Sequence, residues 1–301
     1  KLVMDSVGSP QMHKTVLLEQ SITVLDLKSG DVVVDGTFGG GGHSALILDT
    51  CPDATLIAVD LDEEAESRFE ARFAKESRAQ FVHANFKDAP QILATAKKSH
   101  VDKVLLDLGT STFQLLADTR GFSFNSDTPL RMTFSSKGSH TGFTAYDIVN
   151  HWEASSIADI IYHYGDETKA RVIARAIVEA RERGPIETSG ALAAIVESVV
   201  RRRSKTHPAT KTFQAFRIAV NDELQVITDA LDAWWQVLSP GGRIAVISFH
   251  SIEDRVVKQW MNKVDQTKKR VITKKPLIAT TKELQTNPRS RSAKLRIIEK
   301  K

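Results

Sequence analysis

The chain has 301 residues, a formal net charge of +4 and a single cysteine, Cys51. Its 41% hydrophobic and 26% charged residues are ordinary for a soluble globular protein of one large domain or two modest ones. One cysteine excludes an intramolecular disulfide and a cysteine-ligated metal site, and no apolar run reaches the length of a membrane span. The mild basic excess permits a polyanionic partner without requiring one. We therefore expect a cytoplasmic protein with no metal.

The chain is organised around a glycine-rich stretch after a short apolar run. Val32–Val34 predict a buried strand, because β-branched residues suit a sheet that is covered on both faces. Five of the residues 36–43 are glycines, which let the backbone turn sharply and approach a ligand. His43–Leu48 resume with helical spacing. Strand, glycine loop and helix together open a nucleotide-binding α/β domain.

Two cofactor classes use such an opening. The residues Gly40-x-Gly42-x-x-Ala45 formally match a dinucleotide fingerprint, but they begin five residues after the strand-end Asp35. This spacing of five residues is too long, because the fingerprint loop should follow its strand directly. An NAD-dependent oxidoreductase therefore stays open, with little support.

The second class uses an acid at the strand end followed by spaced glycines. Asp35, Gly39 and Gly41 fit that arrangement, which resembles the first motif of S-adenosylmethionine-dependent methyltransferases. Thr37 stands where a first glycine is usual. The ligand of this motif has a cationic amino-acid tail, which we expect Asp35 to face.

Three further residues fall at predicted strand ends. Asp60 ends the strand Thr55–Asp60, 21 residues beyond Gly39, and an acid about 20 residues on reaches a ribose diol in such domains. Its alternative role is the N-cap of the next helix. Phe86 follows the third strand, where it either covers an adenine ring or packs in the core. Asp107 lies in the fourth strand, Lys103–Gly109, so these residues and Asp35 should share one edge of a parallel sheet.

A helical insert is predicted where the alternating pattern stops, between about residues 110 and 207. Helical spacing covers 145–151, 154–164, 167–183 and 189–203. A basic cluster lies at its end, and this cluster is either a solvated helix end or a phosphate-binding surface. We take the second interpretation for RNA binding and define the basic cluster as Arg201, Arg202, Arg203 and Lys205.

The sheet pattern then resumes towards the C-terminus. We expect one long helix, a fifth strand, another helix and a closing strand pair. In order, these are 212–237 with Gly241-Gly242 as the stop, 243–250, 252–263, and 269–275 with 294–300.

Five long motifs carry a resemblance to a known family: residues 35–43, 107–114, 207–218, 248–255 and 287–292. Together they resemble the small-subunit ribosomal RNA cytosine-N4 methyltransferases, from His13 to the C-terminus. The resemblance implies an α/β fold with a Rossmann-like class I methyltransferase sheet. Its S-adenosylmethionine domain would comprise residues 12–114 and 206–301. An all-helical domain for substrate and RNA recognition would be inserted at residues 115–205.

The resemblance also implies the site and the substrate. The substrate is a cytidine of the decoding centre, within the assembled or assembling small subunit, and the sequence does not decide between a monomer and a homodimer. Asp107 is the nearest acceptor for donor and amine, and His250 is a second candidate whose alternative is a structural hydrogen bond. The S-adenosylmethionine positions of the family fall on Gly41, Gly42, His43, Asp60, Phe86, Asp107 and Gln114.

One stretch, Asp127–Phe134, departs from the family. Arg131 stands where the family has an acid, and Thr133 where it has a basic residue. We expect this loop to meet the target base and Arg131 to slow transfer. The departure also motivates a second hypothesis, a non-catalytic RNA-binding or assembly factor that retains the fold.

Overall fold

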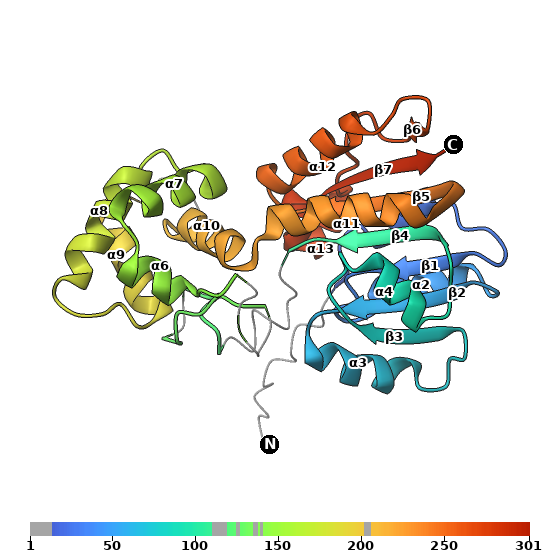
Figure 1. The fold of residues 1–301 in the computed structure, drawn as a ribbon, viewed down its shortest axis with the longest axis horizontal. Coiled ribbons are helices and arrows are strands. Elements are labelled where there is room, and N and C mark those ends of the chain that lie inside the picture. The colour runs from blue at the N-terminus through green and yellow to red at the C-terminus, as the bar shows by residue number, and fades with distance from the viewer. Residues whose placement is uncertain (1–13, 110–118, 125–126, 135–137, 139–140, 202–205) are drawn as a thin grey trace, which may run out of the picture.

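The described chain forms a seven-stranded sheet with helices packed on it and a second group of helices beside the sheet (Figure 1). The computed structural model describes residues 14–109, 119–124, 127–134, 138, 141–201 and 206–301. No helix in these ranges is long and apolar enough to cross a membrane.

The sheet has the strand order β3-β2-β1-β4-β5-β7-β6. Neighbours from β3 to β5 run parallel, whereas β7 is antiparallel to both β5 and β6. The order reverses between β1 and β4, which is where open parallel sheets bind ligands. This arrangement confirms the predicted α/β methyltransferase-like sheet. The strands are β1 Val32–Asp35, β2 Thr55–Asp60, β3 Ala79–His83, β4 Val101–Asp107, β5 Leu238–Ser248, β6 Lys269–Val271 and β7 Lys294–Lys300.

Helices cover both faces of the sheet, so its central strands are buried on both sides. Val32 and Val34 pack in one apolar cluster and Val33 packs in the other, because successive strand side chains point to opposite faces. One cluster includes residues of α4 (Ala89–Thr95), α11 (Glu223–Val237) and α12 (Ser251–Lys263). The other includes residues of α1 (Leu18–Leu25), α2 (Gly42–Thr50) and α3 (Glu63–Phe73).

The helical part lies to one side of the sheet and has its own core (Figure 1). Ile148, Ile161, Ile173, Leu192 and Phe216 are fully buried there, one from each helix. The helices are α6 Ala145–His151, α7 Ala154–Gly165, α8 Ala170–Arg181, α9 Ser189–Val199 and α10 Thr210–Asn221. A short helix α13 (Thr281–Thr286) and a 3-10 turn η1 (Pro288–Ser292) precede β7.

The predicted single helix over residues 212–237 is wrong. Asp222 adopts a left-handed conformation, with φ of 48°, and separates α10 from α11. Gly241 and Gly242 do not end a helix, because α11 ends at Val237 and both glycines lie within β5. Since α10 packs in the core of the helical part, we propose a domain boundary at Asp222 in place of one near residue 205.

Candidate active site

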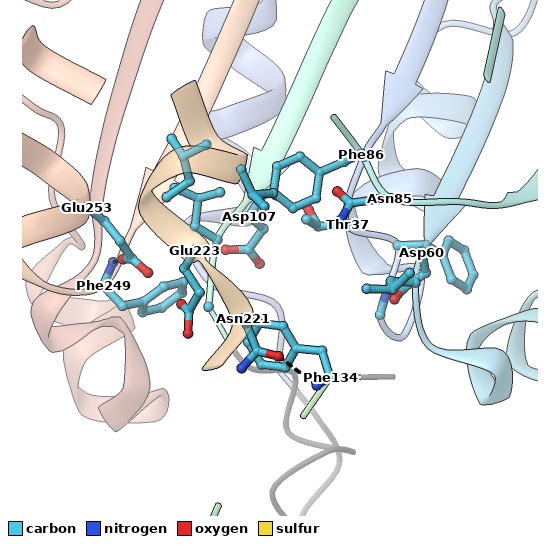
Figure 2. A pocket seen from close by; sticks show the side chains of 18 of the residues that line it. Thr37, Asp60, Asn85, Phe86, Asp107, Phe134, Asn221, Glu223, Phe249 and Glu253 are labelled. Atoms are coloured by element: carbon cyan, nitrogen blue, oxygen red, sulfur yellow. Dashed lines mark hydrogen bonds between the residues drawn. The ribbon is translucent and has the colours of Figure 1, made fainter. Parts of the chain in front are cut away.

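A pocket of about 570 Å³ opens at the carboxyl ends of the parallel strands (Figure 2). Asp107 lies in its middle, at the end of β4. We define the loop side by Thr37, Gly39, Asp60, Asn85 and Phe86. We define the junction side, next to the α10–α11 boundary, by Phe134, Asn221, Glu223, Phe249, Glu253 and Arg289.

The glycine loop has two positions that require glycine. Gly39 has φ of 54°, and a Cβ there would meet only the Thr37 carbonyl oxygen, at 3.9 Å, so it would project into open space. Gly41 has φ of 72° and is the N-cap of α2; a Cβ there would lie 2.7 Å from the Phe38 ring. Gly41 is not among the residues that line the pocket, whereas Gly42 and His43 are. The loop therefore forms the pocket wall through its backbone.

His43 connects the glycine loop to the segment before α1. It is 3% exposed, and its Nε2 lies 3.2 Å from the carbonyl oxygen of Val16, which also lines the pocket. His43 thus lies in the pocket wall, and one of its ring nitrogens contacts the chain that precedes α1, while its assignment to S-adenosylmethionine binding stays a prediction.

Asp35 does not face the pocket. Its side chain is fully buried and accepts hydrogen bonds from the Ser44 hydroxyl, at 2.7 Å, and from the Thr37 N–H, at 3.3 Å. Burial raises the pKa of Asp35 to about 6. The expectation that Asp35 meets a cationic ligand tail is therefore wrong, because its carboxyl ties the glycine loop to α2.

The structure explains why residue 37 is a threonine and not the usual glycine. Its hydroxyl oxygen accepts a hydrogen bond from the backbone N–H of Asp107, at 2.6 Å. A glycine there would leave that N–H without this partner. Thr37 thus couples the glycine loop to the end of β4.

Asp60 lines the pocket as predicted, and it is held by backbone groups. Its two carboxyl oxygens accept from the N–H groups of Gly39, at 2.8 Å, and Asp62, at 2.9 Å. Burial raises the pKa of Asp60, and these two hydrogen bonds oppose the rise. The N-cap of α3 is Asp62, whose side chain accepts from the Glu64 N–H, so the capping alternative for Asp60 is wrong.

Phe86 packs in the core, as one of its two predicted roles requires, and its other role, covering an adenine ring, stays a prediction. It lines the pocket, and it also packs against the apolar cluster beneath the sheet. Its carbonyl oxygen accepts a hydrogen bond from the Trp234 indole N–H at 2.7 Å, which fixes the backbone at this point.

Within the described part of the chain, one carboxyl oxygen of Asp107 has no hydrogen-bond partner. Its Oδ1 is buried and has no hydrogen bond to any described residue. Burial raises the pKa of Asp107 to about 8, and the nearby Asp35 and Glu253 carboxyls add to the rise while Arg289 opposes it. Such an orphaned acceptor is costly to fold, so its persistence indicates a ligand group that completes it.

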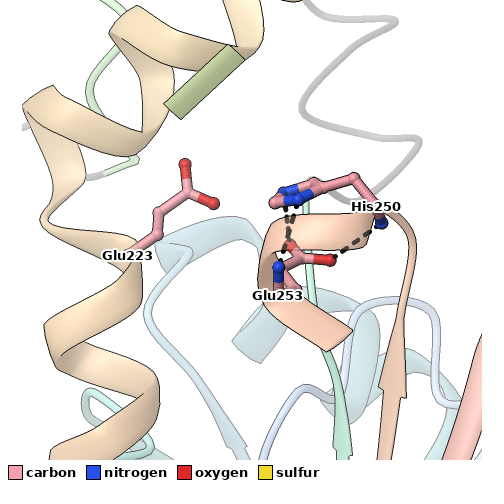
Figure 3. Close-up of side chains that lie close together, drawn as sticks. All are labelled: Glu223, His250 and Glu253. Atoms are coloured by element: carbon pink, nitrogen blue, oxygen red, sulfur yellow. Dashed lines mark hydrogen bonds and ion pairs between the residues drawn. The ribbon is translucent and has the colours of Figure 1, made fainter. Parts of the chain in front are cut away.

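His250 lies outside the pocket lining and begins α12 (Figure 3). Its Nδ1 accepts the backbone N–H of Glu253 at 3.3 Å, and its Nε2 lies 3.0 Å from Oε1 of Glu253. Burial raises the pKa of Glu253, but the contacts with His250 and Arg217 outweigh it and hold that pKa below its ordinary value. These contacts favour the structural hydrogen bond over proton transfer for His250.

Glu223, His250 and Glu253 place one ligand atom each within 4.8 Å of one another, a spacing that suits a metal ion. A cation already lies among them, because the Arg217 guanidinium binds Glu223 at 2.7 and 2.9 Å and lies 3.8 Å from Glu253. Since Nδ1 of His250 accepts a backbone N–H, Nε2 of the neutral ring carries the proton and has no lone pair for a metal. The group is therefore an ion-pair cluster of Arg217 with two carboxylates.

The Asp127–Phe134 loop reaches the pocket through a residue that the sequence did not single out. Phe134 lines the pocket, whereas Arg131 is exposed and is not among the lining residues. Arg131 therefore lies outside the pocket lining, and its contact with the target base stays a prediction. Asn221 and Arg289 were also missed, because no strand-end rule covers a helix end or a turn. Phe249 directly follows β5 and was missed although the strand-end rule covers it.

Several predicted residues cannot be placed. Gln114 lies outside the described residues, as do Arg202, Arg203 and Lys205 of the basic cluster. Arg201 is described, and it is exposed just beyond the end of α9. These assignments stay predictions.

Comparison with known proteins places these features in context. Residues 10–301 match the model of the MraW methylase family. A "ribosomal RNA small subunit methyltransferase H" of Coprothermobacter proteolyticus is 44% identical over 289 residues, which cover 96% of each chain. A relative of the same name from Paenibacillus sp. (strain JDR-2) is 44% identical over 315 residues, covering 96% of this chain and 99% of the relative. A solved rRNA methylase of Streptococcus thermophilus aligns with 96% of this chain and 98% of its own, at 12% identity and a TM-score of 0.45.

Proposed function

The chain belongs to the MraW methylase family, and from this premise we propose that it methylates the N4 amine of a cytidine in small-subunit ribosomal RNA. The methyl donor is S-adenosylmethionine. The observation that carries the proposal is the orphaned carboxyl oxygen of Asp107, between the loop side and the junction side of one pocket.

The loop side fits the donor. S-adenosylmethionine supplies an electrophilic methyl group on a positively charged sulfur. A carboxyl whose ionisation is opposed by burial gains most from a nearby cation, as Asp107 would here. Gly39 leaves room for a ligand against the loop backbone, Phe86 offers an apolar surface for the adenine, and Asp60 is fixed in position to accept from ribose hydroxyls. An NAD cofactor is not favoured by this family.

The junction side fits an amine acceptor. The N4 amine of cytosine is a weak nucleophile because its lone pair is delocalised into the ring, so transfer depends mainly on positioning. Oδ1 of Asp107 accepts one N–H of the amine and thereby turns the nitrogen towards the methyl carbon. As the nitrogen–carbon bond forms, the bond from that carbon to sulfur breaks and S-adenosylhomocysteine leaves, while the proton lost by the amine passes to the Asp107 carboxylate. The high pKa of Asp107 suits that task.

The target base must leave its stack to enter the pocket, unless the RNA is already single-stranded there. Phe134 and Phe249 offer aromatic surfaces on the junction side for a flipped base. Gly109 also lines the pocket, with φ of 93°, a conformation that favours glycine, and a Cβ there would be in ordinary contact with Phe249 at 3.6 Å and Glu253 at 4.0 Å.

RNA outside the pocket is bound by the helical part. We assign phosphate contacts to the basic cluster, of which Arg201 follows α9 at the surface. The substrate is the decoding-centre RNA within the assembled or assembling small subunit, since the flipped base alone offers too little contact for selection.

The test is methyl transfer to small subunits that lack the modification, beside naked ribosomal RNA, with the methylated nucleoside identified by mass spectrometry. We expect N4-methylcytidine, and Asp107→Asn should lower the single-turnover rate about 100-fold or more because it removes the anionic acceptor. A protein that binds S-adenosylmethionine and RNA yet transfers no methyl group to either substrate would favour the non-catalytic assembly factor.

A further inference from the structure

The last turn of α10 makes an unusual connection to the pocket. Asn221, its final residue, is 6% exposed and lines the junction side. Its Nδ2 donates to the carbonyl oxygens of Met132, at 2.7 Å, and Arg217, at 2.9 Å. Its Oδ1 accepts the Phe134 N–H at 2.9 Å (Figure 2). Both amide protons and the oxygen are used, so the orientation of the amide is determined by its partners.

The segment that Asn221 holds belongs to no helix or strand. Met132 is 1% exposed and has φ of 58°, a backbone conformation that non-glycine residues adopt only when surrounding contacts enforce it. Its N–H donates to the Arg120 carbonyl, and the Arg120 guanidinium donates to the Phe134 carbonyl. Asn221 adds its bonds to Met132 and Phe134, and the Thr141 hydroxyl donates to the Val220 carbonyl. The backbone of residues 132–134 is thus fastened to the end of α10.

These bonds fix an aromatic wall of the pocket. The Phe134 ring stacks on Phe122, with centroids 5.7 Å apart and an interplanar angle of 22°, and it faces the pocket. Directly after Asn221 the chain turns at Asp222 into α11, whose first residue, Glu223, is paired with Arg217. The position of Phe134 relative to Asp107 is therefore set through α10, which otherwise packs in the core of the helical part.

We propose that Asn221 is a positioning residue for the methyl acceptor: it holds Phe134 as the wall against which the flipped base stacks. The inference rests on the proposed function and adds to it the residue that couples the helical part to the acceptor. We assign Asn221 no part in binding the donor, because its partners Met132, Phe134 and Arg217 all lie outside the loop side.

The chain offers a matched control in Asn150, near the end of α6. Its Nδ2 donates to the carbonyl oxygens of Tyr146 and Ile186, both at 3.0 Å, and its Oδ1 accepts the Ile186 N–H at 2.8 Å. This is the same pattern as at Asn221: one carbonyl four residues back and the backbone of a distant segment. Asn150 is not among the pocket-lining residues. Alanine at either position removes three hydrogen bonds of the same kinds, but only Asn221 lines the pocket.

The experiment compares Asn221→Ala and Asn150→Ala in methyl transfer to unmodified small subunits, with thermal unfolding and S-adenosylmethionine affinity measured for both. We expect Asn221→Ala to lower kcat about 10–100-fold, since misplacement by about 1 Å has that effect, while its donor affinity stays within about twofold of the wild type. Asn150→Ala should lower the unfolding temperature comparably and leave kcat within about threefold of the wild type.

A double-mutant cycle tests the path through Phe134. If Asn221 acts through that ring, Asn221→Ala should add nothing to the loss in Phe134→Ala. Equal losses of kcat in the two asparagine variants, or additive losses with Phe134→Ala, would overturn the proposal. Wild-type protein that transfers no methyl group at all would overturn the proposed function, and this inference with it.

Discussion

At the scale of single residues, neighbouring carboxyl groups influence the charge of Asp107 in the pocket. Asp35 and Glu253 lie near Asp107 and raise its pKa, and the Arg289 guanidinium offsets only part of that rise. Burial lowers the pKa of Arg289, while Asp107 works against that change. The site therefore favours a cationic ligand over a neutral one, and this preference should depend on pH.

The first prediction concerns donor affinity and pH. The pKa of Asp107 is about 8, above its ordinary value, so in the ligand-free protein its carboxyl is protonated below that pH. A cation favours the carboxylate, so S-adenosylmethionine binding should release a proton and weaken as pH falls below 8, by at most about tenfold per pH unit. Calorimetric titration between pH 6.5 and 9 measures both quantities.

S-adenosylhomocysteine, which lacks the positive charge, should show a smaller pH dependence in the same titration. Asp107→Asn should remove the difference between the two ligands. Asp35→Asn keeps the Asp107 carboxyl, so the difference between the two ligands should persist in that variant, with the pH dependence moved to lower pH because Asp35 no longer raises the pKa of Asp107. Equal pH slopes for both ligands in the wild type would show that Asp107 does not sense the sulfonium.

The second prediction concerns Asp60. Asp60→Ala should weaken S-adenosylmethionine binding by about 1.5–3 kcal/mol, the range for a charge-assisted contact. Part of that loss should come from Gly39, whose N–H loses its carboxylate partner. Calorimetry on a variant shown by circular dichroism to be folded measures the loss. Unchanged affinity would remove Asp60 from the donor site.

At the scale of elements, the Asp127–Phe134 loop contributes Phe134 and not Arg131 to the pocket. The third prediction is that Arg131→Asp changes the single-turnover rate by less than about twofold, as for most exposed side chains away from a site. Methyl transfer to unmodified small subunits at saturating donor measures it. A large rise in the rate would instead restore the hypothesis that Arg131 impedes transfer.

The elements show where sequence patterns stop being informative. Three consecutive valines predicted β1, and the closing pair β6–β7 was expected from its composition; both are confirmed. The break at Asp222 was missed because residues 212–237 keep a helical pattern with neither glycine nor proline at the break. The turn there is stabilised by the Arg217–Glu223 pair, a tertiary contact that propensities do not contain.

At the scale of the whole molecule, the pocket was predictable on one side only. Asp60, Phe86 and Asp107 follow from the rule that ligands bind at the carboxyl ends of parallel strands. Phe134 and Asn221 come from a loop and a helix end, and they reach the pocket only because the helical part packs beside the sheet. Arg289 comes from the 3-10 turn before β7, which no strand-end rule covers. No local sequence pattern indicates that these residues line the same pocket.

The fourth prediction concerns the substrate surface. Changing Arg201, Arg202, Arg203 and Lys205 together to alanine should weaken RNA binding at every sequence and flatten its salt dependence, because phosphate contacts release counterions. Filter binding at several salt concentrations measures the slope. S-adenosylmethionine affinity should stay constant, since the basic cluster is distant in sequence from the loop side. An unaltered slope would leave these residues as a solvated helix end.

The place of β7 in the sheet affects how the protein is made. β5 pairs with β7, and Ser248 is 46 residues ahead of its partner Lys294. At about 5–20 residues per second, roughly 2–10 s of synthesis pass before that partner exists. During this interval β5 presents an unpaired edge on the growing chain, and such edges readily pair with other polypeptides. The yield of folded protein in cells should therefore depend on chaperones that cover the β5 edge during translation.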